Sequence, residues 1–85
     1  MVKYEFTEET FKVGDNVLHR IKATIDFANI KKGELGGFIE KEGNLSQEGN
    51  AWVYGDARVY GDARVYGDAW VSGDARVYGD ARVYG

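Results

Sequence analysis

The chain contains no cysteine and no proline. Without cysteine it can form neither a disulfide nor a thiolate metal site, which fits a reducing cytoplasm. Long apolar runs are missing too, and the N-terminal stretch, MVKYEFTEETFKVGD, carries charges every few positions. This pattern excludes a signal peptide, and no stretch is long enough to cross a bilayer. We therefore expect a cytoplasmic protein.

An excess of charge of one sign is also missing. The 85 residues include 14 acidic and 11 basic ones, for a formal net charge of −3. This balance gives no electrostatic reason to bind nucleic acid or an anionic membrane, so we expect neither as a partner. A chain of this length forms one small domain, whose stability is thin unless regularity or oligomerisation adds to it.

Glycine, in contrast, is abundant and regularly placed. It recurs at every sixth position from Gly43 to Gly85, and the unit it opens is G-D-A-R-V-Y. Alanine and valine stand two apart, so in an extended segment they face one side while arginine and tyrosine face the other. Gly-Asp or Gly-Asn between the segments suits a corner, because these residues tolerate a positive φ. Each unit thus predicts a short strand and a corner.

Two arrangements satisfy this pattern. An antiparallel meander with Gly-Asp turns is one, but it leaves its alanine and valine face uncovered. In the other, every corner bends the same way, three units close one coil, and coils stack about 4.8 Å apart around an alanine and valine core. Trp52 and Trp70, three units apart, would then stack. We favour an all-β, triangular parallel β-helix of about 2.3 coils over residues 43–85.

The array resembles the hexapeptide-repeat left-handed β-helix proteins, in which a small residue follows an aliphatic one four positions later. Val53 with Ala57 has this spacing. The sequence departs from the family after the valine, where Tyr54 and Tyr60 replace the usual small residue. The left hand of the coil is implied by the resemblance alone, since parallel crossovers are generally right-handed.

Residues 1–42 have a different character and contain all six lysines. Alternation of apolar and polar residues predicts a strand over 17–27, and the turn sequence at 14–16 joins it to the preceding apolar residues as a hairpin. A short strand at 36–40 enters the array. We expect 1–42 to form a β cap on the first coil of 43–85, within one structural domain, because an open coil edge leaves N–H and C=O groups unpaired.

The stretch from Leu18 to Val53 also resembles a group of small phage and prophage proteins of unassigned activity. The matching runs are LHRIKA, DF and KKGELGGFIEKEGNLSQEGNAWVYGDARV. In those proteins a similar leader precedes arrays of the unit G-[DN]-A-x-V. The resemblance implies a phage or prophage origin, hence a host cytoplasm, and the same architecture.

An enzyme is one function class to weigh, since hexapeptide β-helices include acyltransferases that use a histidine as general base. The only histidine here is His19, which lies in the leader strand, where packing is the more common role. The array has no insertion and no second titratable partner for it. We expect no catalytic residue and no cofactor.

The column of aspartates suggests calcium, which needs six to eight oxygen ligands. Calcium-binding β-rolls use a nine-residue unit, and one aspartate in each six-residue unit supplies too few oxygens. We expect these aspartates to be corner residues and predict no metal site.

The outward residues of the array are the candidate interaction face. Tyrosine, tryptophan and arginine are enriched in protein interfaces and their hot spots. The same residues can instead stack on one another and stabilise the coil without a partner, so both roles remain open. The face comprises Trp52, Tyr54, Arg58, Tyr60, Arg64, Tyr66, Trp70, Arg76, Tyr78, Arg82 and Tyr84.

The array ends in mid-pattern at Gly85. Because repeat arrays need covered ends, two chains are expected to stack end to end through residues 68–85 as a homodimer. The candidate self-association residues are Val71, Val77, Val83, Ala75 and Ala81.

Together these features predict a non-catalytic scaffold that binds itself and a protein partner, which the sequence does not identify. The alternative is a phage inhibitor of a host defence or nucleic-acid enzyme, presenting its acidic groups as a DNA mimic. One stoichiometric host enzyme in an affinity capture would favour the inhibitor.

Overall fold

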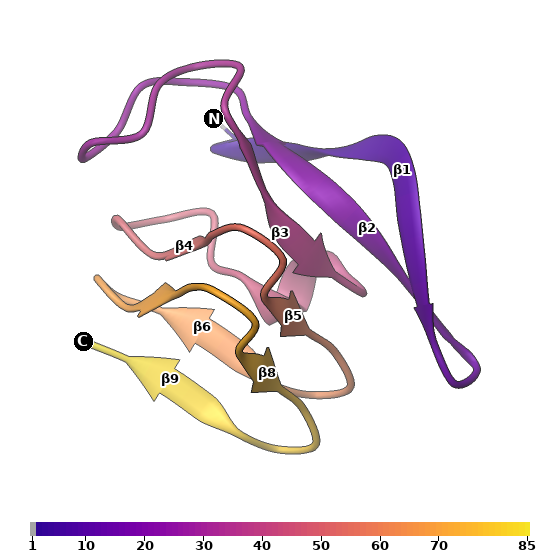
Figure 1. The fold of residues 1–85 in the computed structure, drawn as a ribbon. Helices are drawn as coiled ribbons and strands as arrows, with labels where there is room; N and C mark the ends of the chain where they lie inside the picture. The colour runs from indigo at the N-terminus through magenta and orange to yellow at the C-terminus, as the bar shows by residue number, and fades with distance from the viewer. Residues whose placement is uncertain (1) are drawn as a thin grey trace.

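The molecule consists of β-strands joined by turns and loops and is all-β (Figure 1). The computed structural model describes residues 2–85. Its strands are β1 (Tyr4–Val13), β2 (Asn16–Ala23), β3 (Leu35–Ile39), β4 (Trp52–Val53), β5 (Arg58–Val59), β6 (Arg64–Tyr66), β7 (Trp70–Val71), β8 (Arg76–Val77) and β9 (Arg82–Tyr84), with one 3₁₀ turn, η1 (Glu42–Asn44). No helix in the described part of the chain is long and apolar enough to cross a membrane.

The strands β1 and β2 form the predicted antiparallel hairpin. It turns at Gly14, whose φ of 59° lies in the region that glycine reaches without strain. β2 then pairs antiparallel with β3, which brings the chain to the array (Figure 1). The largest sheet therefore has the order β1-β2-β3-β5-β8, and joins the hairpin to the repeats.

The strand predicted over 17–27 is shorter. The alternation that begins at Val17 also does not mark its inward face throughout. β2 ends at Ala23, Leu18 is fully buried, and Val17 is 41% exposed. The pairing of β2 with β3 shifts register between Arg20 and Lys22. Such an irregularity changes which residues face the core, so uniform alternation could not hold through it.

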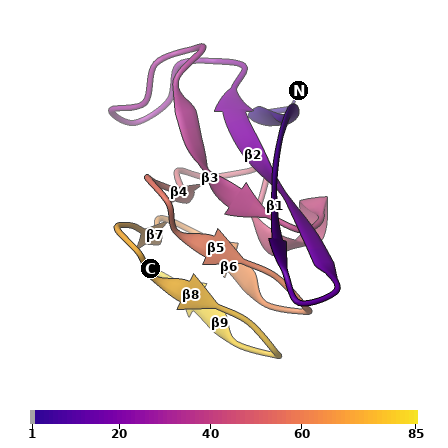
Figure 2. The ribbon, with the colours of Figure 1, turned by 45° about the vertical axis from the view of Figure 1, so that its right-hand side comes forward.

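Neighbouring strands of the array run parallel, and each pairs with the strand three repeat units further along the chain. Trp52 pairs with Trp70, and the β5–β8 and β6–β9 pairs keep the same spacing. Figures 1 and 2 show β8 and β9 lying below β5 and β6 on different sides of the stack. The antiparallel meander is therefore wrong, and the repeats form a solenoid.

Residues 1–42, here called the leader, extend the columns of the solenoid. Their residues pair with residues 20 positions later, whereas residues of the array pair with those 18 positions later. Ile39 pairs with Val59, and Leu45 forms a parallel bridge to Val65. Ile39 and Leu45 are six residues apart, as Val59 and Val65 are, so the two additional residues lie between Leu45 and Val53. Ile39 and Leu45 are both fully buried, so they occupy core positions that valine fills in later coils.

Burial of the core falls along the axis of the solenoid. Val53 and Val59 are fully buried and Val71 is 5% exposed. In the last described coil Val77 and Val83 are only half-buried, and the inward alanines of that coil, Ala75 and Ala81, are exposed. The array is therefore most buried next to the leader and least buried in its last described coil.

Two adjacent glycines let β3 lie directly on the first coil. A Cβ on Gly36 would lie 2.6 Å from the carbonyl oxygen of Val53, and one on Gly37 would lie 2.5 Å from that of Ala57. Contacts this short do not occur for real Cβ atoms, so any side chain here would push β3 off the coil. The pair Gly36-Gly37 thus sets how closely the leader packs.

Candidate functional site

Main-chain hydrogen bonds between successive coils show which carbonyl groups need a donor at the covered end of the array. The N–H groups of Asn50 and Trp52 donate to the carbonyl oxygens of Gly67 and Ala69, each over 3.1 Å, one coil further on. Every glycine and alanine carbonyl of a first coil needs an equivalent donor, because a buried carbonyl without one is costly. The leader supplies these donors at the three corners.

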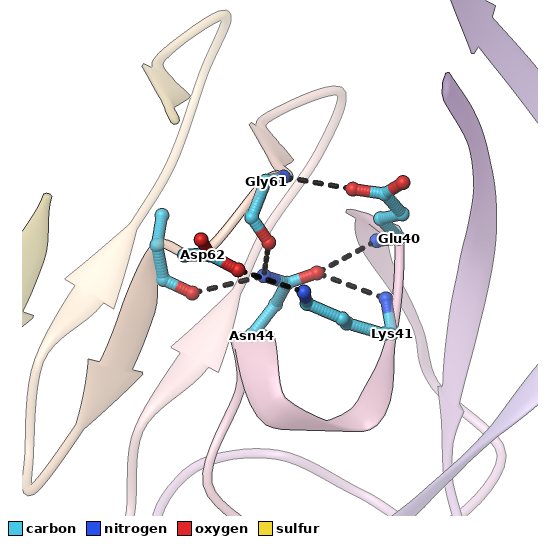
Figure 3. Close-up of polar contacts among 6 residues, drawn as sticks. Glu40, Lys41, Asn44, Gly61 and Asp62 are labelled. Carbon is cyan, nitrogen blue, oxygen red and sulfur yellow. Dashed lines mark hydrogen bonds and ion pairs between the residues drawn. The ribbon is translucent and has the colours of Figure 1, made fainter. Parts of the chain in front are cut away.

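Asn44 serves one corner, as Figure 3 shows. Its amide nitrogen donates to the carbonyl oxygens of Gly61 (3.2 Å) and Ala63 (2.9 Å). Its amide oxygen accepts from the N–H groups of Glu40 (3.0 Å) and Lys41 (2.9 Å). The side chain is fully buried, and all of its main hydrogen-bonding capacity is used.

Lys3 serves a second corner. Its Nζ donates to the carbonyl oxygens of Ala51 (2.7 Å) and Gly49 (3.4 Å) and lies 4.9 Å from the centre of the Phe27 ring. Burial lowers the pKa of Lys3 to about 8, because removal from water disfavours the charged ammonium. A lysine that is only 1% exposed is rare, and here its ammonium group supplies the hydrogen bonds that a preceding coil would otherwise donate.

Arg20 reaches the third corner from β2. Its Nη1 donates to the carbonyl oxygens of Gly36 (2.7 Å) and Gly55 (3.5 Å), while the guanidinium lies 4.4 Å from the centre of the Phe38 ring. The adjacent carbonyl of Ala57 accepts from the N–H of Phe38 over 2.9 Å. Sequence reasoning missed the roles of Asn44, Lys3 and Arg20, because none of them stands in a recognisable motif.

Trp52 does not lie on the interaction face, which corrects the prediction. It is fully buried, whereas its partner one coil on, Trp70, is 53% exposed. The leader covers it: the rings of Phe27 and Tyr4 lie 5.3 and 6.4 Å from the Trp52 ring, centre to centre. Burial also raises the pKa of Tyr4, whose hydroxyl donates to the carbonyl of Leu45 over 2.6 Å.

The tyrosines of the outward face stack between coils. The rings of Tyr60 and Tyr78 are 5.4 Å apart and nearly parallel, and those of Tyr66 and Tyr84 are 5.3 Å apart. Stacking therefore accounts for part of this pattern. Yet Tyr78 remains 58% and Tyr84 67% exposed, so the ladders still offer aromatic surface to solvent.

The remaining members of the face divide by exposure. Those largely open to solvent are Arg64, Tyr66, Trp70, Arg76, Tyr78, Arg82 and Tyr84, and those half-buried are Tyr54, Arg58 and Tyr60. The hairpin accounts for Arg58, whose guanidinium lies 3.9 Å from the centre of the Phe11 ring. The exposed residues lie mainly on the coils furthest from the leader.

A groove of about 430 Å³ runs along one side of the array at β6. Arg64 and Arg82, which pair in register between β6 and β9, both contribute to its wall. The groove is lined by Glu42, Gly43, Leu45, Ser46, Gln47, Arg64, Val65, Tyr66 and Arg82. Charged and aromatic groups of the outward face meet there in a concave surface.

His19 and the column of corner aspartates are the other candidate site residues from the sequence. The imidazole of His19 stacks on the ring of Phe6, 4.8 Å away. Within residues 2–85 no three histidine, cysteine or acidic side chains lie close enough together to hold a metal ion. Asp56 and Asp62 instead contact Arg20 and Lys41, over 3.4 and 3.0 Å.

Comparison with known families bears on the array. The YdcK beta solenoid repeat model matches residues 57–73 and 75–85, about a third of the chain. The chain is thus similar to β-solenoid repeat proteins over the region where the structure shows parallel, in-register coils. No curated protein sequence matches the chain.

Proposed function

We propose that this protein is a non-catalytic β-helical scaffold of phage or prophage origin that binds a protein partner through its outward face. The observation that carries the proposal is the rigid display of Arg, Tyr and Trp side chains at the same position in successive coils. Fixed aromatic and arginine groups lose little entropy on binding, which is why such residues dominate interface hot spots.

The array forms a triangular, left-handed parallel β-helix in this proposal. Three six-residue units per coil follow from the pairing of Trp52 with Trp70, and 43–85 then spans about 2.3 coils. Residues 1–42 act as its cap, supported by the donors that Lys3, Arg20 and Asn44 place on the first coil. The absence of cysteine supports a cytoplasmic location.

Binding through the outward face is tested by affinity capture with matched variants. Immobilised protein and the double variant Arg76→Ala/Tyr78→Ala are compared on the same bacterial lysate. Both residues are exposed, but Tyr78 stacks on Tyr60, so a small fall in thermal stability is expected and the capture is run well below the melting temperature of the variant. A stoichiometric partner held by the parent and lost by the variant supports the proposal; equal retention by both places binding elsewhere.

We also propose self-association into a homodimer through the open coil. The support is the exposure of Ala75 and Ala81 beside half-buried Val77 and Val83, which together form an apolar edge of the last described coil. Light scattering should give a dimer at micromolar concentration. Ala81→Glu should shift it to monomer, whereas Ser72→Glu, an exposed outward position, should not. A monomeric parent protein contradicts this part.

The non-catalytic assignment has its own test. His19 is stacked against Phe6 and so is engaged in packing. Acyl-coenzyme A at millimolar concentration should leave the melting temperature unchanged. A saturable rise in melting temperature, lost in His19→Ala, would reverse the assignment.

The alternative, an inhibitor that mimics DNA through its acidic residues, has weaker support. Glu9 and Glu5 of β1, the acidic strand, pair with Arg20 over 3.0 Å and Lys22 over 3.5 Å. Paired carboxylates present less negative field than a phosphate backbone does. A captured nucleic-acid enzyme whose activity falls on binding would favour this alternative.

A further inference from the structure

The groove at β6 has two arginines without a partner in the described part of the chain. Arg64 and Arg82 are neighbours in register, and adjacent strands lie about 4.8 Å apart. Among residues 2–85, ion pairs hold Arg20, Lys22 and Lys41, and neither groove arginine takes part in an ion pair or side-chain hydrogen bond. Two like charges side by side are unfavourable unless an anion lies between them.

The rest of the groove limits which anion fits. Tyr66, which is 37% exposed and stacked on Tyr84, gives it an aromatic wall, whereas Leu45 and Val65 are at most 1% exposed and form its floor. Gln47 uses its amide oxygen to accept from the N–H groups of Lys3 (2.6 Å) and Tyr4 (3.3 Å). Within residues 2–85 its amide nitrogen makes no hydrogen bond and is available as a donor.

Glu42 lies in the groove as well, so the two arginines and this carboxylate carry a net charge of about +1, which one carboxylate neutralises. A phosphate of about two charges at neutral pH would leave the groove with an excess of negative charge. Arginine binds a carboxylate in a bidentate manner, and the ring of Tyr66 suits the carbon chain that carries it.

We propose that this groove binds a glutamate or aspartate side chain of a partner protein, flanked by an apolar residue. Arg64 and Arg82 hold the carboxylate, and the exposed part of the Tyr66 ring contacts the neighbouring apolar side chain. This proposal rests on the proposed scaffold function and specifies the chemistry that one part of the outward face recognises.

The test is an NMR titration of the full chain that follows the side-chain Nε–H signals of arginine. The probes are acetyl-Glu-Leu-amide, acetyl-Gln-Leu-amide and inorganic phosphate. The glutamate peptide should shift the signals of Arg64 and Arg82 saturably at millimolar concentration, with no saturable shift of Arg76, an exposed arginine at the same repeat position outside the groove. The glutamine peptide should bind at least about fivefold more weakly.

Variants separate the groove from general surface charge. Arg64→Gln should weaken the glutamate peptide about fivefold or more, Arg76→Gln should leave it unchanged, and Glu42→Gln should strengthen it by removing a like charge. Equal effects of Arg64→Gln and Arg76→Gln, equal affinity for both peptides, or tighter binding of phosphate would overturn the proposal. These outcomes concern the groove alone, since the capture experiment with Arg76→Ala/Tyr78→Ala tests the scaffold function through residues outside it.

Discussion

Single polar side chains close the leader end of the solenoid. Asn44 and Lys3 each donate to two carbonyls of the first coil, where later coils use main-chain N–H groups. Each side chain thus replaces two main-chain donors, and both side chains are almost completely buried. Their contribution to stability can be measured one residue at a time.

Asn44→Ala should lower the free energy of unfolding by about 2–4 kcal/mol, because it leaves the carbonyls of Gly61 and Ala63 buried without a donor. Asn50→Ala is the matched control: it also follows a glycine, but its side chain is exposed, and the expected change is within about 0.5 kcal/mol. Urea unfolding followed by circular dichroism measures both. Equal losses would show that Asn44 has no special role.

The lowered pKa of Lys3 predicts that the free energy of unfolding rises with pH. Its pKa is about 8 in the folded protein and near 10.5 when unfolded, so between these values the unfolded chain binds more protons. Stability is therefore lowest below pH 8, where the buried ammonium is charged, and rises by about 1 kcal/mol from pH 7 to 9. Tyr4 acts in the opposite sense above pH 10, since its raised pKa keeps it protonated only when folded.

Urea unfolding at pH 7, 8 and 9 tests this dependence, with Lys3→Met as the control. The methionine variant keeps the aliphatic stem but has no titrating group, so its stability should be flat over the same range. A rise of equal size in both proteins would assign the effect to other groups.

At the level of elements, the approach of β3 to the first coil depends on Gly37. Gly37→Ala should destabilise the protein by about 1–3 kcal/mol, since the new Cβ would lie 2.5 Å from the carbonyl of Ala57 and 2.6 Å from Cγ1 of Val53. Gly43→Ala is the control, because a Cβ there meets nothing within 4 Å. Thermal unfolding compares the two variants; similar melting temperatures would mean that β3 can shift without cost.

The elements of the array could be predicted from sequence, because each six-residue unit carries its own strand and corner and the units repeat without a slip. The contacts of the leader could not. Trp52 and Trp70 occupy the same repeat position, and only the fold of distant residues such as Phe27 buries one and exposes the other. Likewise, the longer spacing between β3 and β5 comes from two additional residues between Leu45 and Val53, and the glycine period, which runs through this segment unbroken, does not reveal them.

The candidate site shows the same division. The exposed members of the outward face were predicted, since inward and outward positions alternate in any short strand. The groove at β6 needed the structure, because it combines Glu42 and Gln47 of the irregular segment with Arg64 and Arg82 of the array. No spacing rule connects these two parts of the chain.

For the whole molecule, the fall in burial along the axis predicts a gradient of local stability. The amide hydrogens of Val77 and Val83, half-buried, should exchange at least about tenfold faster than that of Val59, which is fully buried. Hydrogen exchange followed by NMR measures this, best in Ala81→Glu, where copies should be separate. Uniform exchange rates would indicate that the solenoid opens only as a single unit.

The pairing of each strand with the one three units later has a consequence for how such a gene can vary. Loss or gain of a single six-residue unit would turn every following side chain by a third of a revolution, moving Trp70 to another side of the protein. Loss or gain of three units would restore each side chain to its original side and change only the height of the molecule. Length and surface pattern can therefore be varied separately, in steps that the repeat count sets.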